Sequence, residues 1–252
     1  MASENSVEGL LKAIEHGCYA SEIDIQRTID GYYIVNHDND FRRLAGDVRR
    51  PTSMTLEDVL SVQIPDTTGS GRFLAPATLD EMLQTAKGRI KLIVELKGST
   101  ADPQMVDDVV SKIREMDCIE DIILISFNYE TIAYAEAVYP EFETGVLLEN
   151  RPSDLGDYRC DIILMKHSIA TDARIEQAHA LGKRAFVWTV DTESLQRKFL
   201  ASGVDAVITN EVELAESVSR ELVDEAQNAE ALREQRLAGA RKGLAASAAL
   251  LV

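Results

Sequence analysis

Two acidic side chains lie two positions apart in a stretch that alternates polar and apolar residues. The stretch is SEIDIQ, in which Glu22 and Asp24 alternate with Ile23 and Ile25. Residues two apart on a β-strand share a face, so a strand here places both carboxylates on one side and both isoleucines on the other. The two carboxylates repel each other, and no basic neighbour lies within the strand to offset them.

A second stretch, RIKLIVELKG, carries polar residues at its carboxyl end. Glu95 and Lys97 fall on one face of the predicted strand, and Val94 and Leu96 fall on the face that should pack beneath helices. In barrel enzymes the carboxyl ends of the strands build the active site. We therefore expect Glu95 and Lys97 to face the mouth of a barrel.

A histidine ends a third stretch, YYIVNHD, where His37 takes the last position of the predicted strand. Histidine titrates near neutrality and suits proton transfer. A lone histidine at a strand end would be interpreted as structural, but its proximity to the predicted carboxylates favours an acid/base role. The remaining histidines, interpreted as structural or surface groups, are His16, His167 and His179.

The acidic residues of the first two stretches form a candidate cation site. Three convergent carboxylates without a compensating arginine offer the oxygen ligands that Ca²⁺ and Mg²⁺ prefer. Taken singly, Glu22, Asp24 and Glu95 would each be interpreted as surface or ion-paired groups. Taken together, they predict a divalent metal site.

One tryptophan has two interpretations. Trp188, in RAFVWTV, shares a predicted strand face with Phe186 and Val190. It fills the core or forms a wall for the carbon chain of a substrate.

The elements that position these residues alternate between extended and helical patterns, as in a parallel sheet covered by helices. The predicted strands are 19–26, 32–38, 89–96, 121–127, 143–149, 161–166, 184–190 and 205–210. The predicted helices follow Ser, Thr, Asp or Asn residues that can cap them. Length and pattern predict an α/β fold of the (βα)₈ TIM-like barrel type.

Two segments depart from this alternation. A tight Asp-Gly turn at Asp30 and Gly31 predicts that the first two strands form a hairpin. Residues 39–77 then form an irregular insertion on the barrel, which is expected to span residues 1–215. For residues 216–252 we expect a C-terminal helix followed by a loosely held tail from 238 onward. We interpret this tail as a solvated end rather than an oligomerisation element.

Composition limits the partners of the chain. Its 252 residues carry 26 basic and 43 acidic side chains, and a net charge of -17 argues against nucleic acid. Three distant cysteines and the lack of a signal peptide or a membrane span predict a soluble, cytoplasmic protein. A homo-oligomer is left open.

With these positions identified, the sequence resembles the glycerophosphodiester phosphodiesterase family of (βα)₈-barrel enzymes. The resemblance spans roughly residues 4–215 and keeps the order of the family's motifs. The matching motifs are SENS at 3–6, E-x-D at Glu22 and Asp24, the Asp-Gly turn, His-Asp at 37–38, VELK at 94–97, ISF at 125–127, VWTV at 187–190 and GVDAVITN at 203–210.

The resemblance implies an enzyme of lipid and glycerol metabolism that hydrolyses glycerophosphodiesters to glycerol 3-phosphate and an alcohol. It implies that Glu22, Asp24 and Glu95 bind Ca²⁺ or Mg²⁺, and that Lys97 neutralises phosphate charge. It also implies that His37 is one of two acid/base histidines and that Trp188 contacts glycerol.

One family element is not matched. The family's first strand ends in His-Arg-Gly, upstream of the segment that corresponds to Ser3, and the present sequence begins at Met1. We therefore expect the first barrel strand, the second catalytic histidine and the phosphate-binding arginine to be absent. Three alternatives follow: a truncated active enzyme, a catalytically impaired relative acting as a metal-binding or regulatory module, or a strand supplied by another segment or chain.

Overall fold

The computed structural model describes residues 3–152 and 154–249, and its strands agree with the sequence pattern. Each of the eight predicted extended stretches contains a strand, and a short hairpin adds two more. The strands are β1 (Ala20–Arg27), β2 (Tyr33–Val35), β3 (Ile64–Pro65), β4 (Phe73–Leu74), β5 (Lys91–Leu96), β6 (Ile122–Ser126), β7 (Glu143–Leu148), β8 (Ile162–Lys166), β9 (Arg184–Trp188) and β10 (Ala206–Val207).

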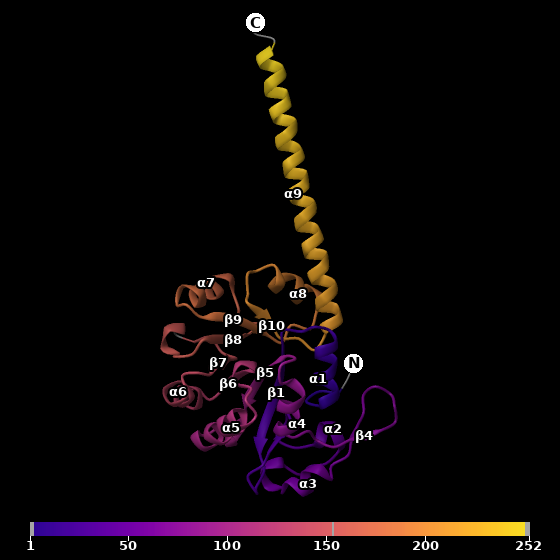
Figure 1. Ribbon diagram of the computed structural model, residues 1–252, viewed down its shortest axis with the longest axis vertical. Coiled ribbons are helices and arrows are strands. Elements are labelled where there is room, and N and C mark those ends of the chain that lie inside the picture. Colours follow the sequence, from indigo (N-terminus) through magenta and orange to yellow (C-terminus); the bar gives the residue numbers. More distant parts are fainter. Residues whose placement is uncertain (1–2, 153, 250–252) are drawn as a thin grey trace.

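Eight of these strands form one curled sheet in the order β10-β9-β8-β7-β6-β5-β1-β2. Neighbouring strands from β10 to β1 run parallel, and helices cover the outside of the curl (Figure 1). Strand β2 pairs antiparallel with the end of β1, with Ile25 opposite Val35. The predicted hairpin is thus confirmed, and Gly31 in its turn has a φ of 86°, which glycine adopts at little cost.

Several helices begin where the sequence offers a capping side chain. Ser6, Thr78 and Asn128 each accept a hydrogen bond from the first turn of the helix that follows, a contact that stabilises a helix by about 1 kcal/mol. The α-helices are α1 (Val7–Glu15), α2 (Arg42–Ala45), α3 (Leu56–Leu60), α4 (Leu79–Ala86), α5 (Pro103–Glu115), α6 (Tyr129–Val138), α7 (Asp172–Ala180), α8 (Glu193–Leu200) and α9 (Val212–Ala249). Four short 3₁₀ turns are η1 (Pro51–Ser53), η2 (Gly98–Thr100), η3 (Ile119–Asp121) and η4 (Leu155–Asp157).

The core has two layers because alternate residues of each strand face opposite sides of the sheet. Ile23, Val94 and Leu96 pack outward against the helices, as predicted from their alternation. Ile93 and Phe186 belong to a separate apolar cluster on the concave side. Glu22, Asp24 and Glu95 alternate with the outward-facing residues and lie on this concave side too, so the inside of the curl is acidic near β1.

The insertion after β2 (residues 39–77), which we call the excursion, packs onto the β1–β2 hairpin through a small apolar cluster of its own. Phe41, Met54, Val59 and Val62 are buried there together with Ile34 of β2. This cluster fixes the backbone of α2 next to the end of β2.

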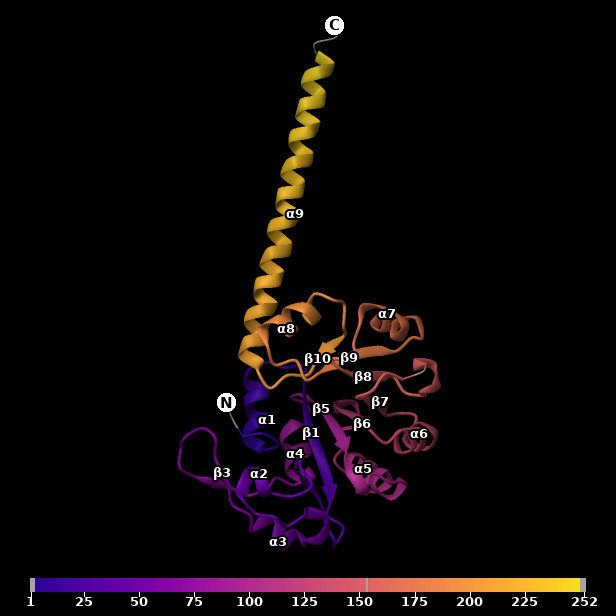
Figure 2. The same ribbon diagram turned by 180° about the vertical axis from the view of Figure 1, so that it is seen from behind.

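The C-terminal helix α9 runs from Val212 to Ala249 and projects far beyond the sheet (Figures 1 and 2). Its first turns lie against α8, where Arg197 pairs with Glu221 and Glu225. The helix therefore continues through most of the stretch expected to form a loose tail, and residues 250–252 of that stretch lie outside the described residues. Among the helices of the described segments, none is both long and apolar enough to cross a membrane.

Candidate active site

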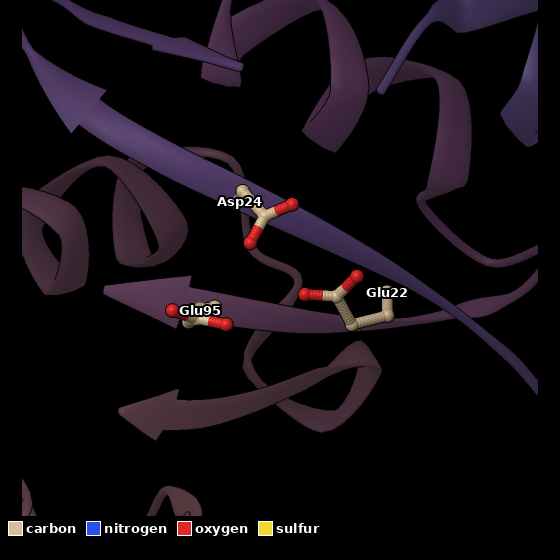
Figure 3. A group of neighbouring side chains, drawn as sticks. All are labelled: Glu22, Asp24 and Glu95. Carbon is tan, nitrogen blue, oxygen red and sulfur yellow. The ribbon is translucent and has the colours of Figure 1, made fainter. Parts of the chain in front are cut away.

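Three carboxylates meet on the concave face of the sheet. Asp24 of β1 lies opposite Glu95 of β5 in the parallel register, and Glu22 lies one pleat earlier on β1. One oxygen from each carboxylate can be chosen so that all three lie within 4.8 Å of one another (Figure 3). The structure thus brings together the three acids that the alternation placed on one face.

The proximity of these acids opposes their ionisation. Burial, followed by the charges of Asp24 and Glu95, raises the pKa of Glu22 well above its ordinary value. Burial and the charge of Asp24 raise the pKa of Glu95 to about 7. Both shifts arise because a desolvated carboxylate beside another negative charge is costly. A bound cation would reverse this cost, so the cluster is built to receive positive charge.

Lys97 supplies part of that charge. It follows β5 directly, and its Nζ lies 3.0 Å from Asp24 Oδ1 and 3.5 Å from Glu95 Oε1. Burial lowers the pKa of the ammonium, but Asp24 and Glu95 raise it by more, so the pKa lies above its ordinary value. The sequence led us to expect no basic neighbour for Glu22 and Asp24 within their own strand. Arg27 of β1 indeed pairs with Asp102 instead, but Lys97 reaches Asp24 from the neighbouring chain segment.

Asn5 is a site residue that the sequence did not single out. Its Nδ2 donates to Asp24 Oδ2 at 2.8 Å, and its Oδ1 accepts from the Asp24 backbone N–H at 3.0 Å. These paired contacts fix the rotamer of Asp24. The SENS motif signalled only a helix start, which Ser6 indeed caps; the adjacent asparagine was the available clue.

His37 lies outside the strand that was expected to carry it. Strand β2 ends at Val35, and His37 belongs to the turn that follows, with 56% of its side chain exposed. The prediction of a strand-end position is therefore wrong by two residues, because the chain leaves β2 to enter the excursion. An open hollow of about 570 Å³ is lined by both His37 and Lys97. The histidine thus faces the same space as the lysine that contacts the acids.

Trp188 lies at the end of β9 and belongs to the concave side. It packs against the apolar cluster that contains Phe186, and its Nε1 donates to the Leu164 carbonyl at 3.1 Å. Phe127, which is 47% exposed, meets the indole ring edge-on with ring centroids 5.5 Å apart. Val190 packs on the outer side instead, so its predicted face is wrong because the strand alternation ends at Trp188.

The other histidines lie on different elements. His16 Nδ1 lies 3.0 Å from Glu216, and His179 Nε2 lies 2.8 Å from Asp205. His167 follows β8, and its Nδ1 is buried without a hydrogen-bond partner among the described residues. The cysteines Cys18, Cys118 and Cys160 are free thiols.

Comparison with known proteins gives one consistent result. The chain matches the Glycerophosphoryl diester phosphodiesterase family over residues 1–214. A glycerophosphodiester phosphodiesterase of Caldanaerobacter subterraneus is 24% identical over 228 residues, which cover 83% of this chain and 89% of the relative.

Solved structures share the fold. A glycerophosphodiester phosphodiesterase from Parabacteroides distasonis superimposes with a TM-score of 0.73 at 27% identity, covering 89% of this chain and 92% of that protein. A phosphodiesterase of Oleispira antarctica, solved in complex with the product sn-glycerol-3-phosphate, superimposes with a TM-score of 0.78 at 22% identity, covering 86% of this chain and 91% of the other. The curled α/β sheet is therefore that of the barrel fold predicted from the sequence.

Proposed function

Because the chain belongs to the Glycerophosphoryl diester phosphodiesterase family, we propose that it hydrolyses glycerophosphodiesters to glycerol 3-phosphate and an alcohol with the help of a divalent cation. The observation that carries the proposal is the convergence of Glu22, Asp24 and Glu95 next to a hollow lined by His37 and Lys97. The relative solved with sn-glycerol-3-phosphate supports the choice of product.

The three acids are suited to a hard cation. Each offers a carboxylate oxygen that lies within 4.8 Å of one from each of the other two. Carboxylate oxygen is the ligand type that Ca²⁺ and Mg²⁺ take. With all three ionised and Lys97 protonated, the cluster carries two unmatched negative charges. When bound there, Ca²⁺ or Mg²⁺ supplies Lewis-acid stabilisation of negative charge on the phosphodiester.

Lys97 contributes a second positive charge at the same place. Only 15% of its side chain is exposed, so its ammonium acts where water screens it weakly. It lies between the acids and the hollow, where the phosphate of a bound substrate would be placed. In our proposal Lys97 neutralises charge that builds up on the phosphate oxygens during cleavage.

His37 has the geometry of a proton-transfer group. Its Nδ1 lies 2.8 Å from Asp38 Oδ1, and an ionised carboxylate only accepts, so Nδ1 carries the hydrogen of this contact. Nε2 is then the ring nitrogen that exchanges a proton with the substrate. In our proposal His37 serves as a general acid or base at the hollow.

Trp188 and Phe127 offer an apolar surface on the same concave side. Their edge-on contact holds both rings in place, and the rings present carbon atoms rather than charge. In our proposal these two rings contact the carbon chain of the glycerol moiety.

Product analysis tests this function. The whole chain is incubated with glycerophosphocholine or glycerophosphoethanolamine and either Mg²⁺, Ca²⁺ or EDTA, and products are followed by phosphorus NMR. We expect glycerol 3-phosphate with a metal, none with EDTA, and a loss of about 10²-fold or more in His37→Ala. Metal binding without turnover would contradict the proposal and favour a non-catalytic module.

A further inference from the structure

Arg43 connects the segment that carries His37 to the N-terminal turn of the chain. From α2, its Nη1 and Nη2 donate to the two carboxylate oxygens of Glu4 at 2.7 and 2.6 Å. Its Nε donates to Asp38 Oδ2 at 2.7 Å. One guanidinium therefore holds two carboxylates that lie far apart in the sequence.

The other carboxylate oxygen of Asp38 contacts the ring of His37. Asp38 Oδ1 lies 2.8 Å from His37 Nδ1, while Oδ2 accepts from Arg43. Burial raises the pKa of Asp38, but hydrogen bonds from Arg43 and His37 lower it by more, and the net pKa lies below its ordinary value. The carboxyl is thus ionised at neutral pH, and its orientation depends on Arg43.

The far end of this chain of contacts reaches the acidic cluster. Glu4 directly precedes Asn5, whose side chain makes two hydrogen bonds with Asp24. Arg43 therefore joins the residue that orients His37 to the turn that orients Asp24. One side chain thus links the turn that carries His37 to the acidic cluster.

These contacts differ from an ordinary surface ion pair. The side chains of Arg43 and Glu4 are 50% and 40% exposed, and an isolated pair with that exposure contributes little to stability. Here the guanidinium makes a two-pronged contact and a third bond, a geometry that fixes orientation as well as charge. The backbone of α2 is itself held because Phe41, which precedes Arg43 by two residues, is fully buried. Such an arrangement gains little energy but sets positions.

We propose that Arg43 is a positioning residue that fixes His37, through Asp38, relative to the acidic cluster, which it reaches through Glu4 and Asn5. The inference rests on the proposed function, because positioning matters for turnover only if His37 transfers a proton. Arg43 acts through the histidine and does not itself react.

The test compares Arg43→Met with a matched control on the same excursion. Arg49 makes a comparable two-pronged contact with Asp47, with Nη2 and Oδ2 2.6 Å apart, so Arg49→Met removes an equivalent surface pair. Two quantities are measured on the whole chain: kcat and KM for glycerophosphocholine with Mg²⁺ or Ca²⁺, and the nitrogen NMR signals of the His37 ring, assigned with His37→Gln.

We expect Arg43→Met to lower kcat by about 10- to 100-fold, the scale of a misplaced catalytic group, while KM changes by less than about threefold. In the wild type the His37 ring signals should show mainly the tautomer with a proton on Nδ1. In Arg43→Met they should show a mixture of the two tautomers. Arg43→Lys keeps the charge but not the planar fork, so it should restore kcat only in part. Arg49→Met should leave both quantities unchanged.

Three outcomes would overturn the inference. A kcat for Arg43→Met within about twofold of wild type is one, and unchanged His37 ring signals are another. A rise in KM with kcat unchanged is the third, since it would mean that Arg43 contacts substrate directly. If the wild-type chain shows no turnover, the proposed function fails, but the ring signals still decide the positioning role. If Arg43→Met does not fold, Arg43→Gln replaces it, and unchanged ring signals there also overturn the inference.

Discussion

The Nζ atom of Lys97 lies 3.0 Å from Oδ1 of Asp24, across two neighbouring parallel strands. This contact places a buried positive charge inside a group of three carboxylates. It offsets one negative charge and leaves the cluster able to take a divalent cation. The lysine and a bound cation would then share the task of neutralising a phosphodiester.

Replacing Lys97 should separate its two roles. Lys97→Met is expected to lower kcat by about 10²- to 10³-fold, the usual cost of losing a group that stabilises developing charge. Metal binding should persist, because the three carboxylates remain. Steady-state kinetics and metal titration check both statements. Lys91→Met is the control, since Lys91 begins β5, away from the acids, and donates to the Glu120 carbonyl. Retention of more than a tenth of the activity in Lys97→Met would contradict its role.

Metal should stabilise the fold through the three acids. At a free metal concentration of about 100 times Kd, binding adds about 2.7 kcal/mol to the free energy of unfolding. For a chain of this size we expect a rise in Tm of about 5 to 10 °C. Asp24→Asn and Glu95→Gln should abolish the rise in a thermal scan, whereas Glu120→Gln, on the exposed surface, should retain it. The ligand assignment would be wrong if Asp24→Asn gave the full rise.

The stability of the metal-free protein should depend on pH through Glu95. Its pKa is raised from 4.5 to about 7, so the folded state holds a proton that the unfolded chain releases. Between these pH values the folded state binds more protons, and stability therefore falls as pH rises. The loss is on the order of 3 kcal/mol at most.

Urea unfolding in EDTA at pH 5, 6 and 8 measures this dependence. From pH 5 to pH 8, the free energy of unfolding of the wild type should fall relative to that of Glu95→Gln, which lacks the titrating carboxyl. Parallel pH curves for the two proteins would argue against a protonated Glu95. Added metal should reverse the loss at pH 8, because the ligands bind it in their ionised form.

The aromatic pair should affect substrate binding more than chemistry. Trp188→Ala removes the ring that meets Phe127, and we expect KM for glycerophosphocholine to rise about tenfold, equivalent to about 1.4 kcal/mol. Trp188→Phe should recover most of this affinity. Phe73→Ala is the control, since Phe73 is exposed on β4. An unchanged KM in Trp188→Ala, with the fold intact by circular dichroism, would remove the ring from the substrate site.

The fold was predictable because strict alternation leaves little freedom. Ile23 and Val94 must face helices, so Asp24 and Glu95 must face the inside of the curl. The same logic gave all eight strands of the main sheet, and the family match over residues 1–214 confirms the resemblance found from short motifs.

Contacts between distant segments were not predictable in this way. Arg43 and Glu4 are 39 positions apart, and no local pattern signals their pairing. The β3–β4 hairpin has only two residues per strand, too few for a period to appear. His37 and Val190 were misplaced because each lies just past the end of its strand, where alternation no longer governs direction.

In our proposal, one cation held by Glu22, Asp24 and Glu95 drives phosphodiester hydrolysis by this chain. The most direct measurement titrates Mg²⁺ or Ca²⁺ into the EDTA-treated protein and records binding heat and glycerophosphocholine turnover on the same preparation. Turnover should rise in proportion to the occupancy of a single site, and Asp24→Asn should lose both signals. Full turnover in EDTA, or a saturated site with no turnover, would contradict it.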